Sequence, residues 1–163
     1  MTNDAILDHV IATGEPYELI DCDPDLADTA QFCEAYGYRM DESANAIIVI
    51  GKADPKLYAA CLVLATTRLD VNGAVRRRLG TRKASFAPAE DTMELTGMTI
   101  GGVTPFGLPP ALPLWIDARI MELERVIVGG GSRDRKLYVA PTALTKLVGA
   151  AVVENLARVP SPQ

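Results

Sequence analysis

Two glycine-rich segments hold the residues whose types and spacing best suit chemistry on a ligand. The first spans 101–109 and reads GGVTPFGLP. Glycine permits backbone conformations with positive φ and lets N–H groups approach a ligand closely, while proline keeps such a loop rigid. A rigid loop with exposed N–H groups could bind a carbonyl oxygen or stabilise the oxyanion that forms from it. A tight connection between two elements would have the same composition, so both interpretations remain open at this point.

The second segment spans 129–133, reads GGGSR and follows an apolar stretch. Its backbone N–H groups, together with Arg133, could hold a phosphate or a carboxylate. It matches neither the mononucleotide-binding pattern GxxxxGK[ST] nor the dinucleotide-binding pattern GxGxxG, so it gives little support for a site of either kind. A flexible turn between two strands is the alternative. Asp117 follows Trp115 and Ile116 within a strand-like stretch and is either a turn former or a site residue directed at the two loops.

Basic side chains gather between positions 68 and 83. Three consecutive arginines at 76–78 on a helix cannot all face one way, but two of them could join the next two basic residues in contacting phosphates. This basic group consists of Arg76, Arg78, Arg82 and Lys83. A helix face exposed to solvent is the alternative interpretation.

The net charge conceals a separation of charge along the chain. The 163 residues include 16 basic and 21 acidic side chains, for a formal charge of −5. Residues 1–46 contain eleven of the acidic side chains and a single basic one, Arg39. The rest of the chain is therefore net positive, and an acidic protein with this distribution can still bind a polyanion such as RNA.

Cysteine and histidine contents restrict the chemistry further. The three cysteines have no CxxC spacing, which argues against a disulfide framework or a zinc knuckle and favours small buried side chains. With a single histidine, His9, mechanisms based on a histidine pair or a three-histidine metal site are excluded, so we expect no metal and no cofactor. No apolar run approaches the ~20 residues of a membrane span, and the first residues do not resemble a signal peptide, so the expected location is cytoplasmic.

Strand-like and helix-like stretches alternate along the whole chain without a long linker. This pattern predicts a single α/β domain of mixed α+β character with a mixed sheet, covering 1–159 and followed by a tail at 160–163. Helices are expected over 4–13, 26–36, 71–79, 88–94 and from Pro141 onward. Strands are expected over 17–21, 45–50, 57–65, 82–87, 114–120, 125–128 and 136–139.

A series of short motifs resembles the YbaK/ProX-type trans-editing proteins, whose fold is that of the editing domain inserted in bacterial prolyl-tRNA synthetases. The resemblance covers roughly 17–148, and its most specific part is the GxxxP element from Gly101 to Pro105. The other matching pieces are 68–70 (RLD), 80–87 (GTRKASFA), 94–97 (ELTG), 116–117 (ID), 130–133 (GGSR), Leu137 and 140–141 (AP). The resemblance implies a mixed sheet or partial barrel with surrounding helices.

The resemblance also implies an activity, namely hydrolysis in trans of the ester that links a mischarged amino acid to the 3′ end of tRNA. Members are thought to cradle the aminoacyl carbonyl with the glycine-rich loop and to need no metal, while the 2′-hydroxyl of the tRNA helps to position the water. The partners would be tRNA and, in addition, an aminoacyl-tRNA synthetase; no membrane is involved. The residues that would form the carbonyl pocket are Asn45, Gly101, Gly102, Thr104 and Pro105, and those that would line it are Asp117, Gly130, Gly131, Ser132 and Lys136.

One position departs from the family pattern. Members usually read Ala-Lys-Thr-Leu on an early strand, where the lysine is thought to contact the terminal nucleotide, and this chain reads Ala-Asn-Ala-Ile at 44–47. An amide donates hydrogen bonds but has no charge. Lys83, Lys136 or an arginine could supply the missing charge from another strand. The alternatives are a binding module that has lost hydrolysis and binds aminoacyl-tRNA, an amino acid or a nucleotide, and a hydrolase of another small ester or amide.

Overall fold

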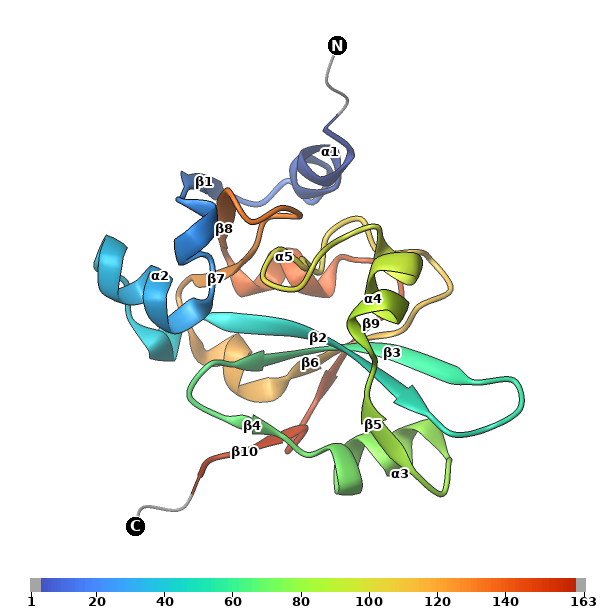
Figure 1. Ribbon diagram of the computed structural model, residues 1–163. Helices are drawn as coiled ribbons and strands as arrows, with labels where there is room; N and C mark the ends of the chain where they lie inside the picture. Colours follow the sequence, from blue (N-terminus) through green and yellow to red (C-terminus); the bar gives the residue numbers. More distant parts are fainter. Residues whose placement is uncertain (1–3, 161–163) are drawn as a thin grey trace.

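A five-stranded mixed sheet runs through the centre of the molecule. The structure is a computed structural model that describes residues 4–160, and the strand order of this sheet is β5-β2-β3-β6-β9 (Figure 1). The first three strands in that order are antiparallel, and β3, β6 and β9 are parallel. The strands span Ala84–Phe86 (β5), Ala44–Gly51 (β2), Leu57–Leu64 (β3), Leu114–Asp117 (β6) and Ala150–Val153 (β9).

Two smaller sheets complete the strand arrangement. An antiparallel sheet has the order β1-β8-β7 and contains Tyr17–Asp21 (β1), Arg135–Val139 (β8) and Val126–Gly129 (β7). A single parallel bridge between Ser43 and Ile127 brings this sheet beside the start of β2. The third sheet is an antiparallel pair of β4 (Arg68–Leu69) and β10 (Ala157–Arg158).

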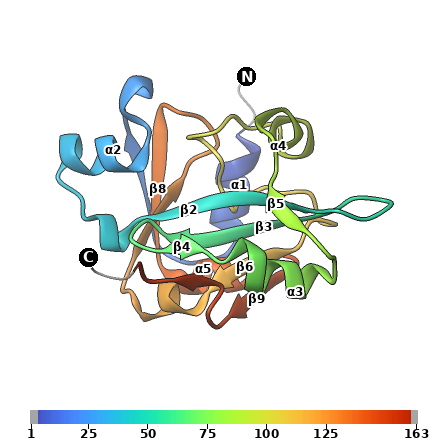
Figure 2. The ribbon, with the colours of Figure 1, turned by 60° about the horizontal axis from the view of Figure 1, so that its bottom comes forward.

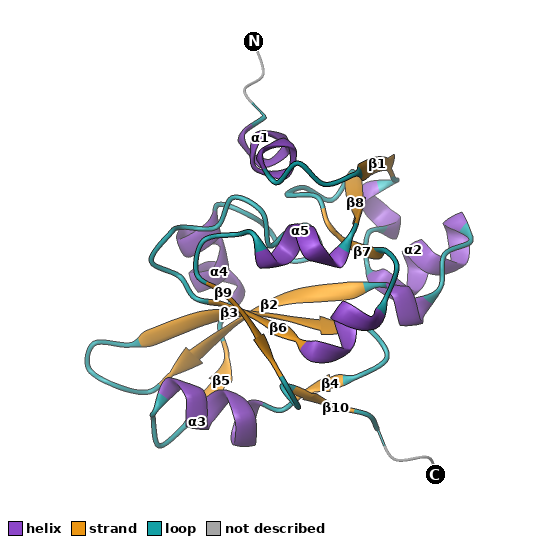
Figure 3. Cartoon of the chain, turned by 180° about the vertical axis from the view of Figure 1, so that it is seen from behind, coloured by secondary structure: helices purple, strands orange, loops and turns teal. Residues whose placement is uncertain are grey.

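Helices lie on both sides of the central sheet. Figures 1 and 3 show α3 on one side of it and α4 and α5 on the other, while α2 lies beside the start of β2. Left-handed glycines end α2, α3 and α4, at Gly37, Gly80 and Gly97 respectively, because a residue without Cβ adopts positive φ readily. The α-helices are Ala5–Ala12 (α1), Thr29–Tyr36 (α2), Arg76–Leu79 (α3), Ala89–Thr96 (α4) and Pro141–Thr145 (α5). The 3₁₀-helices are Pro24–Leu26 (η1), Met40–Glu42 (η2) and Ala118–Glu122 (η4), and Val71–Val75 (η3) is a π-helix.

The apolar core is divided by the central sheet. Alternate residues of a strand face opposite sides, so Ala60, Leu62 and Leu64 of β3 join the main core and the intervening residues join a second core under α3. A third cluster lies under α2, around Phe32. All three cysteines are buried and unpaired, as expected, and burial raises the pKa of the Cys61 thiol to about 12. Among residues 4–160, no helix has the length and hydropathy that crossing a membrane would require.

The expected mixed α/β domain is confirmed, but some element boundaries were wrong. The strand expected over 114–120 ends at Asp117, because its carboxylate accepts a hydrogen bond from the Arg119 N–H at 2.9 Å and begins η4. The sequence pattern did not predict the short strands β4, β9 and β10. Of the tail expected at 160–163, residues 161–163 lie outside the described part of the chain.

Candidate functional site

A cavity of about 540 Å³ lies where α2, β2 and the two glycine-rich loops meet. Its wall is mostly apolar, with a few polar side chains that could orient a ligand. The apolar contribution comes from Ala27, Phe32, Ala44, Ala46, Ile47, Ile48, Phe86, Ala87, Ile100, Val103, Ile127 and Val128, and the remaining lining residues are Asp28, Thr29, Ser43, Asn45, Thr92, Gly101, Gly129 and Lys136.

The cavity exists because one edge of β2 is left open. β5 pairs only with 49–51, and the Ile48 carbonyl accepts one further hydrogen bond from the Ala87 N–H at 2.9 Å. Just before the other end of β2, a bridge between Ser43 and Ile127 is the only backbone pairing with the neighbouring sheet within residues 4–160. Alternate residues of an antiparallel strand direct their N–H and C=O groups to the same edge, so Ala46 directs both groups to the side that Ile48 uses. Since no described strand pairs with 44–47 there, these backbone groups are available to a ligand.

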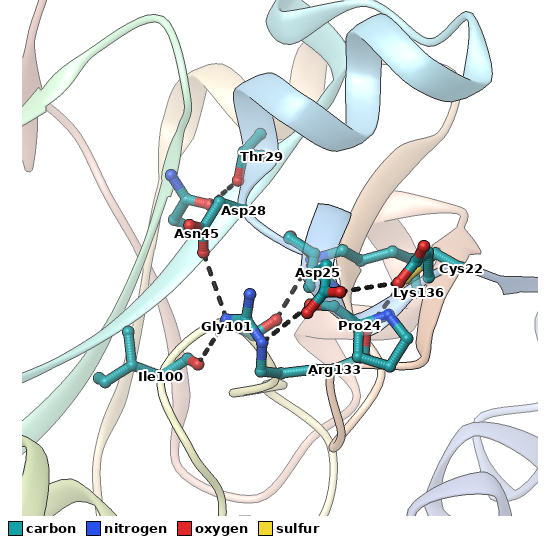
Figure 4. A network of polar contacts seen from close by, with 12 residues as sticks. Cys22, Pro24, Asp25, Asp28, Thr29, Asn45, Ile100, Gly101, Arg133 and Lys136 are labelled. Atoms are coloured by element: carbon teal, nitrogen blue, oxygen red, sulfur yellow. Dashed lines mark hydrogen bonds and ion pairs between the residues drawn. The ribbon is translucent and has the colours of Figure 1, made fainter.

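Lys136 brings an ammonium group into this mostly apolar cavity. It lies on β8 and is only 7% exposed. Its Nζ donates hydrogen bonds to the carbonyl oxygens of Ala27 at 2.6 Å and Gly101 at 3.3 Å (Figure 4). An ammonium group has three N–H donors, so one remains for a ligand. Burial lowers the pKa of Lys136, because an apolar environment disfavours the charged form.

Asn45 occupies the position at which the family lysine was expected, on the open stretch of β2. Its side-chain oxygen accepts a hydrogen bond from the Thr29 hydroxyl at 2.6 Å. Thr29 is the first residue of α2, so this contact joins the helix to the strand edge. Within residues 4–160 the Asn45 amide nitrogen has no acceptor, so it is a second donor that a ligand could use.

Arg133 joins the two glycine-rich loops to the segment that precedes α2. Its Nε donates to the Pro24 carbonyl at 3.1 Å, and its Nη1 donates to the Ile100 carbonyl at 3.0 Å and lies 3.3 Å from an Asp28 carboxylate oxygen. Figure 4 shows the guanidinium between Ile100 and Asp28. A Cβ at Gly101 would collide with this guanidinium, and Gly101 has φ of +94°. Gly101 is therefore required both for the loop conformation and for the approach of Arg133.

We expect Gly101→Ala to lower both stability and ligand turnover. Positive φ costs alanine about 1 kcal/mol, and displacement of Arg133 would shift the cavity wall enough to reduce activity about tenfold. Gly80→Ala is the matched control, because Gly80 has φ of +71° and an added Cβ would meet nothing within 4 Å. Thermal melts would measure the loss of stability, and a ligand-turnover assay would measure the loss of activity. Equal activity losses in both variants would contradict the role of Arg133.

Three of the residues predicted for the site meet at the cavity, namely Asn45, Gly101 and Lys136. The other predicted residues of the glycine-rich loops do not line it. The Gly102 carbonyl accepts a hydrogen bond from the Gly131 N–H at 2.8 Å, which joins the two loops. Gly102, Thr104 and Pro105 are buried outside the cavity lining, as is Gly130. Gly131 packs toward Ile6 of α1. Ser132 is exposed, and its hydroxyl donates a hydrogen bond to the Asp134 carboxylate.

Asp117 is not a lining residue, and its side chain stabilises the fold instead. It is 1% exposed and accepts hydrogen bonds from the backbone N–H groups of Arg119 at 2.9 Å and Ala157 at 2.7 Å. The Arg119 guanidinium forms an ion pair with the same carboxylate at 3.2 Å. Of the two interpretations offered by the sequence, the structure supports the turn former.

The basic group divides between two places. Arg76 and Arg78 lie on α3, which Figure 2 shows below β2 and β3. The Arg78 guanidinium is 5.0 Å from the ring centroid of Trp115, which belongs to the second core. Arg82 and Lys83 are exposed in the turn that leads into β5, whose last residue, Phe86, lines the cavity.

Sequence reasoning missed the contribution of α2, and of the two residues before it, to the site. Ala27, Asp28, Thr29 and Phe32 line the cavity, but they lie about 70 to 110 positions from the loops that they face. Such contacts have no local signal in a single sequence. Asn45 was the accessible clue, since a polar side chain within an apolar strand suggests a place where the strand is not fully covered.

Comparisons with known proteins identify the family and the fold. The model of the aminoacyl-tRNA editing domain family matches residues 23–147. The uncharacterized protein YwhH of Bacillus subtilis (strain 168) is 25% identical over 120 residues, which are 74% of each chain. The crystal structure of the hypothetical protein APE2540 is 26% identical with a TM-score of 0.81 and covers 92% of this chain and 97% of that one.

A second solved structure, of a candidate trans-editing enzyme for prolyl-tRNA synthetase, shares the fold. Its TM-score is 0.79 at 23% identity, with coverage of 97% of this chain and 98% of that one. The family match spans the η1–α2 segment, the open edge of β2, both glycine-rich loops and Lys136. The chain belongs to the aminoacyl-tRNA editing domain family.

Proposed function

We propose that the protein hydrolyses, in trans, the ester bond of a mischarged aminoacyl-tRNA. The observation that supports this proposal is the Lys136 ammonium in the cavity wall, hydrogen-bonded to Gly101 of the glycine-rich loop. It brings a positive charge from β8 into a site that lacks the family lysine on β2, where Asn45 stands. Such a substrate occurs in the cytoplasm, where we expect the protein to act.

Each part of the cavity has a role in this reaction. The aminoacyl side chain would lie against the apolar wall, and the ester carbonyl oxygen would accept hydrogen bonds from the free donors of Lys136 and Asn45. Water then forms a bond to the carbonyl carbon, and the negative charge that develops on the oxygen is stabilised by these donors. The ester C–O bond breaks, and the leaving ribose oxygen takes the proton that water gives up. The products are the free amino acid and uncharged tRNA.

A panel of mischarged tRNAs tests the proposal. We expect the protein to hydrolyse at least one member about 100-fold faster than buffer, the effect of one preorganised oxyanion donor. The measurement is the loss of radiolabelled amino acid from tRNA over time, with correctly charged prolyl-tRNA and other cognate pairs as controls. If no member is hydrolysed faster than in buffer, the proposal is wrong.

A binding module is the second candidate, and one observation favours it. Two of the three Lys136 donors are already used by backbone carbonyls, and Asn45 carries no charge. Tight binding of charged tRNA without turnover, together with a gain of deacylation in Asn45→Lys, would support this candidate. Hydrolysis of small model esters with indifference to tRNA would instead indicate a different small substrate. An aminoacyl-tRNA synthetase remains a proposed partner in the first two cases.

A further inference from the structure

An exposed aromatic side chain lies at the edge of the cavity, and within residues 4–160 it stacks on no other ring and contacts no cation. Phe86 ends β5, the edge strand of the central sheet, and 58% of it is exposed. On one side it lines the main cavity. On the other side it lines a second hollow of about 490 Å³ between the β2–β3 hairpin and the start of α4. Phe86 is therefore the boundary between the two spaces.

The second hollow carries positive charge on the hairpin side. Lys52 and Lys56 line it, and the Lys52 N–H donates to the Lys83 carbonyl at 2.9 Å, which brings a third lysine to the same end of the hairpin. All three are exposed, and none forms an ion pair within residues 4–160. The opposite wall carries Glu90 and Asp91, and Asp91 accepts a hydrogen bond from the Tyr58 hydroxyl. A chain of phosphates would therefore follow the lysine side.

We infer that Phe86 is a stacking platform for an unpaired nucleotide next to the aminoacylated end of the RNA, and that Lys52, Lys56 and Lys83 contact the phosphates beyond it. This inference rests on the proposed function, because an ester held in the main cavity is covalently attached to a strand that must leave through the cavity mouth. Aromatic side chains beside lysines are the combination by which proteins hold single-stranded RNA. The flat face of a base would cover the exposed ring, and the lysines would neutralise the backbone charge.

The geometry favours RNA over a protein partner at this place. A protein-docking surface is expected to present a broad apolar patch with a polar rim. The second hollow instead has a single exposed aromatic side chain, with two lysines on the hairpin side that form no ion pair within residues 4–160 and two carboxylates on the α4 side. Ile100, 56% exposed, also lines the main cavity and adds apolar surface for the terminal nucleotide.

The principal test compares a long and a minimal substrate. With the aminoacyl-tRNA that the unaltered protein hydrolyses in the panel, Phe86→Ala should raise KM about tenfold, the loss expected for one stacked base. With the corresponding aminoacyl-adenosine, which lacks the preceding nucleotides, KM should rise much less, because only the contact of Phe86 with the cavity contents is then lost. Phe86→Trp should restore KM for the tRNA, and Phe86→Leu, which keeps apolar volume without an aromatic face, should not. Ile11→Ala is the control, because Ile11 is an exposed apolar residue that lines neither space.

A binding measurement keeps this inference separate from hydrolysis. A short single-stranded RNA ending in CCA and labelled at its 5′ end should bind with an anisotropy change that weakens in Phe86→Ala, and a blunt duplex RNA should bind equally to both proteins. Lys52→Glu combined with Lys56→Glu should reduce the salt dependence of CCA-RNA binding. If the protein binds this RNA through Phe86 but hydrolyses no charged tRNA, the platform stands and the proposed function fails.

Several results would overturn the platform. Equal KM changes for tRNA and aminoacyl-adenosine would make Phe86 merely part of the cavity wall, as would full activity of Phe86→Leu. RNA binding unaffected by Phe86→Ala, with hydrolysis of charged tRNA intact, would leave the proposed function standing without this platform. Self-association that is lost in Phe86→Ala, together with unchanged RNA affinity, would show that the ring contacts a protein.

Discussion

We expect Lys136→Met to reduce deacylation of the hydrolysed aminoacyl-tRNA by about 100-fold or more in kcat/KM, the loss typical of one oxyanion donor. Methionine has similar length and suits the apolar wall, but it cannot donate a hydrogen bond to the ester carbonyl. It also leaves the carbonyls of Ala27 and Gly101 without the Lys136 donor. Single-turnover hydrolysis, corrected for the buffer rate, measures the effect.

Lys146→Met is the matched control for this substitution. Lys146 also donates to a backbone carbonyl, that of Thr13 at 2.9 Å, but it is not a lining residue of the cavity. Its replacement should leave deacylation unchanged. Equal activity of Lys136→Met and the unaltered protein would exclude the ammonium from the reaction.

A double substitution tests whether Lys136 supplies the charge that the family lysine supplies elsewhere. Adding Asn45→Lys to Lys136→Met places an ammonium on β2 at the same cavity, so we expect partial recovery of deacylation. If activity is not recovered although both variants are folded, Lys136 acts by holding the shape of the loop through Gly101, and its positive charge is not what the reaction needs.

The pH dependence distinguishes a charged from a neutral Lys136. Burial lowers the pKa of Lys136 below its ordinary value of 10.5. If the ammonium stabilises the oxyanion, the enzymatic rate above buffer falls as pH rises through this lowered pKa. If the neutral amine instead accepted a proton from water, the rate would rise through the same range. Only the first direction agrees with the proposal.

Stability should respond to pH in the opposite sense. Between the lowered pKa and 10.5 the unfolded chain holds a proton on Lys136 that the folded chain has lost. The free energy of unfolding therefore rises with pH across this interval, since the unfolded state binds more protons. Denaturant unfolding at several pH values should show this rise in the unaltered protein and a smaller one in Lys136→Met.

The second large effect is expected at Asp117, and it concerns folding. In Asp117→Asn one carboxylate oxygen becomes an NH₂ group, so one of the two backbone donors, at Arg119 or Ala157, faces another donor. Together with the loss of the ion pair to Arg119, we expect a loss of about 3 kcal/mol in the free energy of unfolding and about 9 °C in Tm. Thermal and urea unfolding measure both quantities.

The kinetics of the same variant check where Asp117 acts. Because this side chain does not line the cavity, kcat and KM of the folded variant, measured well below its Tm, should match those of the unaltered protein. A large fall in kcat with an unchanged Tm would instead place the carboxylate at the reacting ester.

Local patterns in the sequence determined a large part of this structure. Apolar runs at 45–50 and 57–65 predicted two neighbouring strands, which form at 44–51 and 57–64. The helices expected over 26–36, 71–79 and 88–94 stop at or near the glycines that end α2, α3 and α4. These features depend on residues a few positions apart, because hydrogen bonding and φ preferences act over one turn or one strand. The sequence also determined the absence of histidine chemistry and the presence of a glycine-rich loop.

Only the tertiary structure decided which residues form the site. Lys136 and Asn45 are 91 positions apart, and the contacts of Arg133 with Pro24 and Asp28 span more than 100 positions. Whether a lysine faces solvent or a cavity depends on which segments pack around it, and no local pattern records that. The same reason explains Asp117, whose partner Ala157 belongs to an unpredicted strand. Burial and long-range pairing therefore decided that Asp117 stabilises the fold and that Lys136 lies in the cavity wall beside the glycine-rich loop.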